Sequence, residues 1–173
     1  ATTYPGVTIT DKEIHIVGEG YKPHDAFGLS TKISAITFST SGSLSTSGSS
    51  LEGVESTSTV TINGSSTTNL TNITLKRCFI PYLQSTYAEV LAYNNVLGHV
   101  ALSTTSLNCA FYNNIFDWAA SLFQYGYAQV YLNCSSTSTF SGNHIFKNNI
   151  FLTRGSANKM ANTFGNSAFS DNI

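Results

Sequence analysis

Short alternations of apolar and polar residues run along the chain and predict β-strands. Residues 13–17 read EIHIV and residues 59–63 read TVTIN. A period of two is typical of a strand that buries one face. Residues 40–50 are nearly all Ser, Thr and Gly, and we interpret them as loop or weakly patterned strand. We therefore expect an all-β chain whose first part, residues 1–58, is irregular.

A five-residue motif recurs in the second part of the chain. It reads YNNVL at 93–97, YNNIF at 112–116 and KNNIF at 147–151, with looser copies elsewhere. The central positions are 78, 95, 114, 133, 149 and 166, so that successive centres are 17, 19, 19, 16 and 17 residues apart. Self-similarity at a nearly fixed period predicts a stacked repeat architecture. We predict one solenoid segment over residues 1–173, with regular rungs of about 16–20 residues from residue 59 onward.

The positions around each centre predict which side chains face the core. Residues three before the centre and one after it are largely apolar, and we expect both columns to face inward. The column after the centre contains Phe79, Val96, Ile115 and Ile150. Side chains alternate between faces along a strand, so the column two before the centre should face outward. This outward column contains Lys76, Tyr93, Tyr112, Tyr131 and Lys147.

The centres themselves are mostly asparagine. A corner between two strands often needs a left-handed or bridge conformation, which asparagine tolerates better than most residues. Its amide also carries donors and an acceptor, so that stacked copies can satisfy one another. We therefore predict an asparagine ladder formed by Asn95, Asn114, Asn133, Asn149 and Asn166.

Several stretches resemble the rungs of a known fold family. They are YPGVTIT at 4–10, IHIVGEGY at 14–21, ITLKRCFI at 73–80 and the repeated NNIF. The chain resembles right-handed parallel β-helix proteins of the pectate-lyase-like type, and is most similar to uncharacterised secreted or surface β-helix proteins of the Bacteroidetes type. The resemblance implies a single-stranded right-handed parallel β-helix, located outside the cell, at the cell surface or on a virion. It is specific for architecture rather than for activity, because one fold hosts many functions.

Composition narrows the class of partner. Charged residues make up 10% of the chain and the formal net charge is −1, which leaves no basic patch for a nucleic-acid backbone. No apolar run approaches the length needed to cross a bilayer. Eleven Phe and nine Tyr argue against disorder. The three cysteines, Cys78, Cys109 and Cys134, allow one pair with one left over or three free thiols, and we interpret them as small buried core residues.

The acidic residues do not suggest catalysis. Glycoside hydrolysis usually needs two carboxylates across one sugar bond, whereas Glu89 and Asp117 lie in different rungs at unmatched positions. Lyases of the family that this chain resembles use a cluster of acidic residues to bind calcium, and this chain lacks such a cluster. Glu13 and His15 fall on the polar face of a strand near His24, which we interpret as surface rather than as a metal site. We expect no cofactor, no metal and no catalytic residue.

The outward column is the best candidate for binding. Aromatic faces in a row suit sugar rings, and hydroxyl and ammonium groups suit sugar oxygens, although packing between rungs explains the same column. One hypothesis is a non-catalytic stalk or adhesin with weak glycan contact. The alternatives are a carbohydrate-active enzyme or tailspike with catalytic residues elsewhere, and a structural module of a phage or secretion assembly. Residues 171–173 begin another copy of the motif, so we expect further chain or a protein partner at that end.

Overall fold

Short parallel strands make up the described part of the chain. A computed structural model describes residues 2–19, 30–42, 44–117, 130–133, 142–152, 161–162 and 167–173. Within these residues the strands form two sheets and no helix is present, so the predicted all-β class is confirmed. Every pair of hydrogen-bonded strands is parallel.

Among the described residues the smaller sheet has seven strands, one for each described passage of the chain along that side of the molecule. In spatial order they are β3 (His15–Val17), β6 (Ser50–Glu52), β9 (Leu70–Lys76), β11 (Ala88–Tyr93), β13 (Ala110–Tyr112), β16 (His144–Lys147) and β19 (Ser167–Ser170). Neighbours in this sheet are consecutive passages. The chain therefore visits the other sheet before it adds each new strand.

The larger sheet, in the part of the chain that the structure describes, has twelve strands in two rows. The first row is β1 (Thr3–Tyr4), β4 (Thr31–Ile33), β7 (Val54–Ser56), β10 (Phe79–Thr86), β12 (Val96–Ser103), β14 (Ile115–Asp117) and β17 (Ile150–Leu152). The second row is β2 (Val7–Thr10), β5 (Ile36–Ser39) and β8 (Thr59–Asn63), then the far halves of β10 and β12, then β15 (Val130–Asn133) and β18 (Ala161–Asn162). The long strands β10 and β12 therefore join the two rows.

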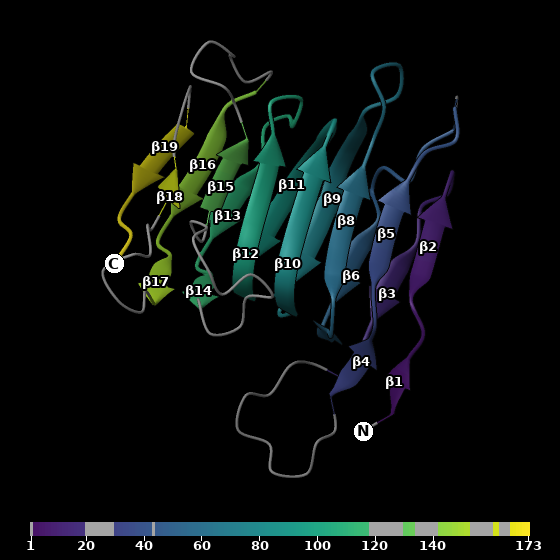
Figure 1. Cartoon of the computed structure of the whole chain (residues 1–173), viewed down its shortest axis with the longest axis horizontal. Coiled ribbons are helices and arrows are strands. Elements are labelled where there is room, and N and C mark those ends of the chain that lie inside the picture. Colours follow the sequence, from purple (N-terminus) through teal and green to yellow (C-terminus); the bar gives the residue numbers. More distant parts are fainter. Residues whose placement is uncertain are drawn as a thin grey trace.

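One circuit of the chain consists of a smaller-sheet strand, a first-row strand and a second-row strand. The strands β6, β7 and β8 form one such circuit, and β9 returns to the smaller sheet beside β6. Figure 1 shows the circuits laid side by side. The strands β1, β2 and β3 lie at the N-terminal end of the stack, and the strands β17, β18 and β19 lie at the C-terminal end. Parallel pairing needs a long crossover between partners, and the opposite sheet supplies it here.

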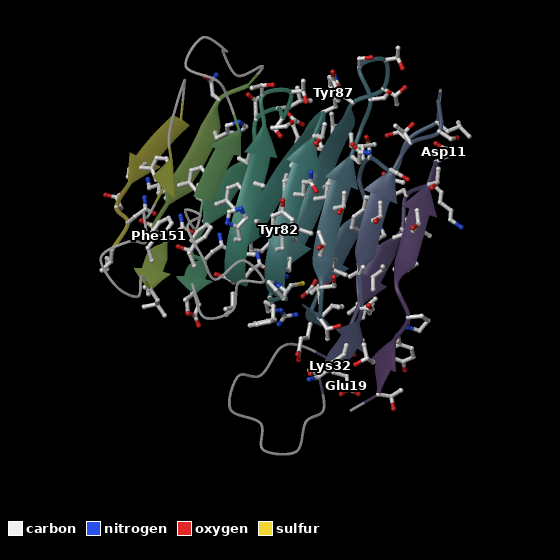
Figure 2. All side chains as sticks on the ribbon, viewed as in Figure 1. Asp11, Glu19, Lys32, Tyr82, Tyr87 and Phe151 are labelled. Atoms are coloured by element: carbon white, nitrogen blue, oxygen red, sulfur yellow. The ribbon has the colours of Figure 1, made fainter. Side chains whose placement is uncertain are left out.

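The core lies between the two sheets and changes character along the stack. Around β5 to β9 it is mainly aliphatic, with side chains such as Ile36, Leu51 and Ile73 that have no exposed surface. Further along, phenylalanine rings stack from one circuit to the next: Phe111 on Phe146 with centroids 4.7 Å apart, and Phe146 on Phe169 at 4.5 Å. Phe116 stacks on Phe151 in the same way at 4.5 Å, and Figure 2 places Phe151 at the end of the stack opposite Asp11.

A ladder of buried asparagines follows the corner between the smaller sheet and the first row. Asn114 Oδ1 accepts the backbone N–H of Asn95 at 2.9 Å and its side-chain amide at 3.0 Å. In the same way, Asn149 Oδ1 accepts hydrogen bonds from the backbone N–H and the side-chain amide of Asn114. Asn172 Oδ1 accepts hydrogen bonds from the backbone N–H and the side-chain amide of Asn149. Each side-chain amide also donates a second hydrogen bond to a backbone carbonyl in the preceding circuit. Asn95, for example, donates to the Leu75 carbonyl at 3.0 Å. The buried amides are thereby fully satisfied, which burial requires.

The predicted members of the ladder are only partly those observed. Consecutive ladder bonds span 17, 19, 35 and 23 residues, so the circuit from Asn114 to Asn149 is far longer than the predicted rung. Asn133 lies instead in β15, opposite Ser103 in the larger sheet, so its predicted place in the ladder is wrong. Asn166 lies outside the described residues. Asn172 occupies the last ladder position, in the copy of the motif predicted at residues 171–173.

The residue before each ladder position turns the corner. Asn94, Asn113 and Asn148 have φ of 58°, 56° and 57°, the left-handed conformation that asparagine tolerates well. This residue shifts the inside-outside alternation by one place, so that the asparagine after it is buried. The column that follows is therefore turned outward: Ile115 and Ile150 are 37% and 41% exposed. The expectation that Phe79, Val96, Ile115 and Ile150 face inward is wrong for this reason.

Candidate carbohydrate-binding surface

Four side chains form one row across the outer face of the smaller sheet. Strand pairing sets Lys76 beside Tyr93, Tyr93 beside Tyr112, and Tyr112 beside Lys147. Each residue immediately precedes the left-handed corner residue of its circuit, which brings the four into register. The first three are half-buried and Lys147 is exposed. We call these four residues the lysine–tyrosine row.

Tyr131 does not belong to this row. Its strand, β15, pairs with β12, and Tyr131 lies opposite Ala101 in the larger sheet. A period of 16 to 20 residues places a rung at Tyr131, whereas the chain from Tyr112 to Lys147 makes a single circuit. The predicted column of five therefore contracts to four members, with Lys147 directly beside Tyr112.

The two ends of the row carry paired charges. Lys76 Nζ lies 3.3 Å from a carboxylate oxygen of Glu52 and 5.7 Å from the centre of the Tyr93 ring, within the range of a cation–π contact. Arg77 also binds Glu52, and its hydrogen bond is the main reason that the pKa of this carboxyl is lowered, with the bond from Lys76 next. Lys147 Nζ lies 3.9 Å from Asp171. The cations are thus largely balanced, and the tyrosine rings form the middle of the row.

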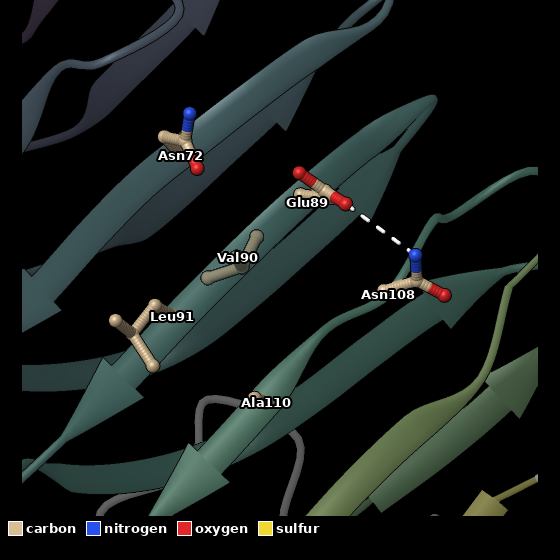
Figure 3. Close-up of a pocket in the computed structure, with 6 residues that line it drawn as sticks. All are labelled: Asn72, Glu89, Val90, Leu91, Asn108 and Ala110. Atoms are coloured by element: carbon tan, nitrogen blue, oxygen red, sulfur yellow. Dashed lines mark hydrogen bonds between the residues drawn. The ribbon is translucent and has the colours of Figure 1, made fainter.

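A shallow pocket lies next to the row on the same sheet. It is lined by Asn72, Glu89, Val90, Leu91, Asn108 and Ala110. Figure 3 shows Glu89 on β11 directed toward Asn108, whose side-chain amide donates to the Glu89 carboxylate at 3.4 Å. Asn108 Oδ1 in turn accepts the backbone N–H of Asn143 at 2.9 Å. We call these six residues the bulge pocket.

An irregularity in the strand pairing shapes the bulge pocket. Leu70 pairs with Ala88 and Ile73 pairs with Val90, so β9 contains one more residue than β11 over this stretch. Asn72 has a left-handed backbone with φ of 57° and an exposed side chain. A bulge of this kind redirects side chains and is common beside functional sites. From the sequence we assign Glu89 no catalytic role and do not find the pocket, because a bulge leaves no simple spacing signal.

The other acidic and metal-binding candidates do not come together. Glu89 lies in the smaller sheet and Asp117 lies in β14 of the larger sheet, so they do not face one sugar bond. His15 Nε2 lies 3.1 Å from Glu13, and His15 Nδ1 lies 2.8 Å from Ser50 Oγ. No group of three or more His, Cys, Asp or Glu side chains in the described ranges could hold a metal ion. His24 lies outside those ranges.

The cysteines within the described residues are buried and unreactive. Cys78 and Cys109 are free thiols, and burial raises their pKa to about 11 and about 12. Each stays protonated at neutral pH, which removes the thiolate needed for nucleophilic or metal chemistry. Cys134 lies outside the described residues.

Comparison of the chain with protein-family models, with curated proteins and with solved structures gives no match. The described residues contain no helix long and apolar enough to cross a membrane. The class that the structure defines is an all-β protein with parallel strands in two sheets. Its function must therefore be inferred from the surface described above.

Proposed function

We propose that this chain is a segment of a right-handed parallel β-helix that serves outside the cell as a non-catalytic stalk or adhesin. In this proposal it sits at a cell surface or on a virion and binds carbohydrate weakly through the lysine–tyrosine row. The observation that carries the binding proposal is the register of Tyr93 and Tyr112. These two half-buried rings are neighbours on an outer sheet face.

The strand pairing supports the β-helical part of the proposal. Each strand pairs in parallel with its counterpart one circuit away, and successive circuits contribute to the same three rows of strands. The asparagine ladder adds a side-chain column in which each member bonds to the next circuit. Such a stack is rigid because every circuit shares hydrogen bonds and core contacts with its neighbours, which suits a shaft.

The chemistry of the row supports a carbohydrate ligand. Neighbouring strands lie about 4.8 Å apart, so Tyr93 and Tyr112 form a short strip of two neighbouring side chains on this face. Tyrosine combines an apolar ring face with a polar hydroxyl, and sugars present the same combination of C–H faces and hydroxyls. Lys76 and Lys147 add hydrogen-bond donors at the two ends of the strip.

A structural module of a phage or secretion assembly is a second proposal, and one observation favours it. Ile115 and Ile150 pair on the outer face of the first row, and Leu152 follows on β17. They are 37%, 41% and 48% exposed, which makes a local apolar strip. Exposed apolar strips often mark protein contacts. Self-association that Ile150→Lys abolishes, with no glycan binding, would favour the assembly module over the adhesin.

A glycan array tests the adhesin proposal. We expect the wild-type chain to bind a subset of glycans and the folded double variant Tyr93→Ala/Tyr112→Ala to lose that binding. Tyr131→Ala is the matched control, because the same substitution then lies in the larger sheet. Circular dichroism and thermal unfolding establish that each variant is folded. Binding that survives in the double variant, or that disappears only in Tyr131→Ala, contradicts the proposed row.

A further inference from the structure

The structure also points to how a glycan is selected. We propose that the bulge pocket binds a neutral saccharide unit, with Glu89 accepting hydrogen bonds from two adjacent sugar hydroxyls. This inference rests on the proposed carbohydrate-binding function of the lysine–tyrosine row. It assigns a second, polar subsite to the same outer face and names the class of ligand.

The carboxylate of Glu89 has unused capacity to accept hydrogen bonds. Its hydrogen bond from Asn108 is long, at 3.4 Å, and no ion pair of Glu89 is present within the described ranges. A carboxylate has about four lone-pair sites, and its hydrogen bonds are stronger than those of a neutral acceptor. Two neighbouring hydroxyls can donate to its two oxygens together. Glu89 is therefore suited to a diol.

The amides around Glu89 complete a polar site. The backbone bond from Asn143 holds Asn108 in place, at 2.9 Å. Asn72, positioned by the bulge, adds both a donor and an acceptor on the other side of Glu89. Two amides and one carboxylate can satisfy several hydroxyls whose orientations differ, which a saccharide ring requires.

A trough links this polar site to the tyrosines. On the outer face, Ala110 lies between Leu91 and Ile145 in adjacent strands. Leu91 and Ile145 are 39% and 38% exposed, whereas alanine is small, so the two larger side chains form walls beside it. Glu89 and Tyr93 are four residues apart on β11, about 13 Å in an extended strand. An oligosaccharide can therefore contact both sites.

The charge pattern favours a neutral ligand over an acidic one. Glu89 would repel a uronic acid or a sulfated sugar placed in the pocket. The two lysines of the row already face carboxylates, Lys76 that of Glu52 and Lys147 that of Asp171. An acidic glycan would gain little from those lysines and lose hydrogen bonds at Glu89.

The test compares neutral oligosaccharides with their uronic-acid counterparts on one array, then measures affinity for the best neutral probe. We expect neutral probes to be preferred. We expect Glu89→Gln to weaken binding about tenfold, because a charged group with two acceptor oxygens is replaced by a neutral amide that has one acceptor oxygen and one donor group. Glu19→Gln is the matched control, since Glu19 is exposed and lies beside Thr31, at the start of β4 in the larger sheet. It should leave the affinity unchanged, and added salt should have little effect.

The failures of the two proposals are distinguishable. If Glu89→Gln binds as tightly as wild type while Tyr93→Ala/Tyr112→Ala does not bind, the row stands and the pocket inference is overturned. A preference for acidic probes overturns the pocket inference in the same way. If the tyrosine double variant binds normally, or wild type binds no glycan, the proposed function itself falls and the pocket inference falls with it.

Discussion

The early and late circuits reach the same parallel architecture with different chemistry. In the early part, the corner between β6 and β7 consists of Gly53, with φ of 66°, followed by the fully buried Val54. In the late part, the same corner is a pair such as Asn113, with φ of 56°, followed by the buried Asn114. Gly53 N–H bonds to the Lys76 carbonyl one circuit on, as the corner residues of the late circuits do. The two corners are therefore equivalent positions.

The difference shows what the fold requires at this corner. One residue must accept a left-handed backbone, and the next must fill a buried site without leaving polar groups unpaired. Valine meets the second requirement by burying only apolar atoms, and asparagine meets it by bonding to its neighbours. Cys78 joins the two regions: its thiol donates to the Leu51 carbonyl at 3.4 Å, as Asn95 donates to Leu75.

The largest effect expected from this comparison is the loss of a ladder asparagine. Asn114→Ala leaves the backbone and side-chain N–H groups of Asn95 and the Ala92 carbonyl without their buried partner. Each such group costs about 1–3 kcal/mol, so we expect the free energy of unfolding to fall by about 3 kcal/mol or more. Val54→Ala, at the equivalent early position, removes only apolar contacts and should cost about 2 kcal/mol. Urea unfolding of both variants measures the difference.

An equal or smaller loss for Asn114→Ala than for Val54→Ala would show that the ladder is no stronger than plain apolar packing. Circular dichroism at low denaturant is needed beside the unfolding curves. It separates a destabilised fold from one that has rearranged around the missing amide.

The next effect, of similar size, is expected from pH, through His144 in the late part. His144 is fully buried, and burial lowers its pKa from 6.5 to about 4. Its Nδ1 accepts the Cys109 N–H at 3.3 Å, which a protonated ring cannot do. Because the unfolded chain binds the proton more readily, this contribution to stability is complete above pH 6.5 and is lost as the pH falls toward 4. The full loss is on the order of 3 kcal/mol.

The free energy of unfolding measured from pH 7 to pH 4 tests this expectation. His144→Asn keeps a hydrogen-bond acceptor but does not titrate, so its stability should vary less over this interval than that of wild type. Asp11 and Glu52 have lowered pKa values and are present in both proteins, so their contribution cancels in the comparison. Parallel pH profiles for the two proteins would contradict the assignment to His144.

Sequence predicted the all-β class, and part of the ladder where the motif repeats without interruption. The copies at Asn95 and Asn114 are one short circuit apart, so their spacing reports directly on the stacking. Between Asn114 and Asn149 the chain takes one circuit of 35 residues. Asn133 and Tyr131 fall near its middle, where a constant period places a rung. The looser copy of the motif around Asn133 has the expected spacing. Only the pairing of β15 shows that it is not a true copy.

The early corner and the bulge pocket left no comparable signal. Gly53 and Val54 are common residues in any strand-rich chain, and only the pairing of β6 with β9 shows that they share a corner with the asparagines. Glu89 becomes part of a site because one additional residue in β9 shifts the register beside it. Both features depend on which strands are neighbours, which alternation along one segment does not specify.

The smallest expected effect tests whether the two corners are interchangeable. Gly53→Ala forces a side chain into a left-handed backbone and should cost about 1 kcal/mol. Gly53→Asn should cost less, because asparagine adopts this conformation at Asn113 in the equivalent place. Asn113→Gly should be nearly neutral and Asn113→Ala should resemble Gly53→Ala. Thermal unfolding of the four variants gives the order. If Gly53→Asn were as costly as Gly53→Ala, backbone conformation alone would not explain the early corner, and the close packing of β6 on β9 would have to exclude any side chain there.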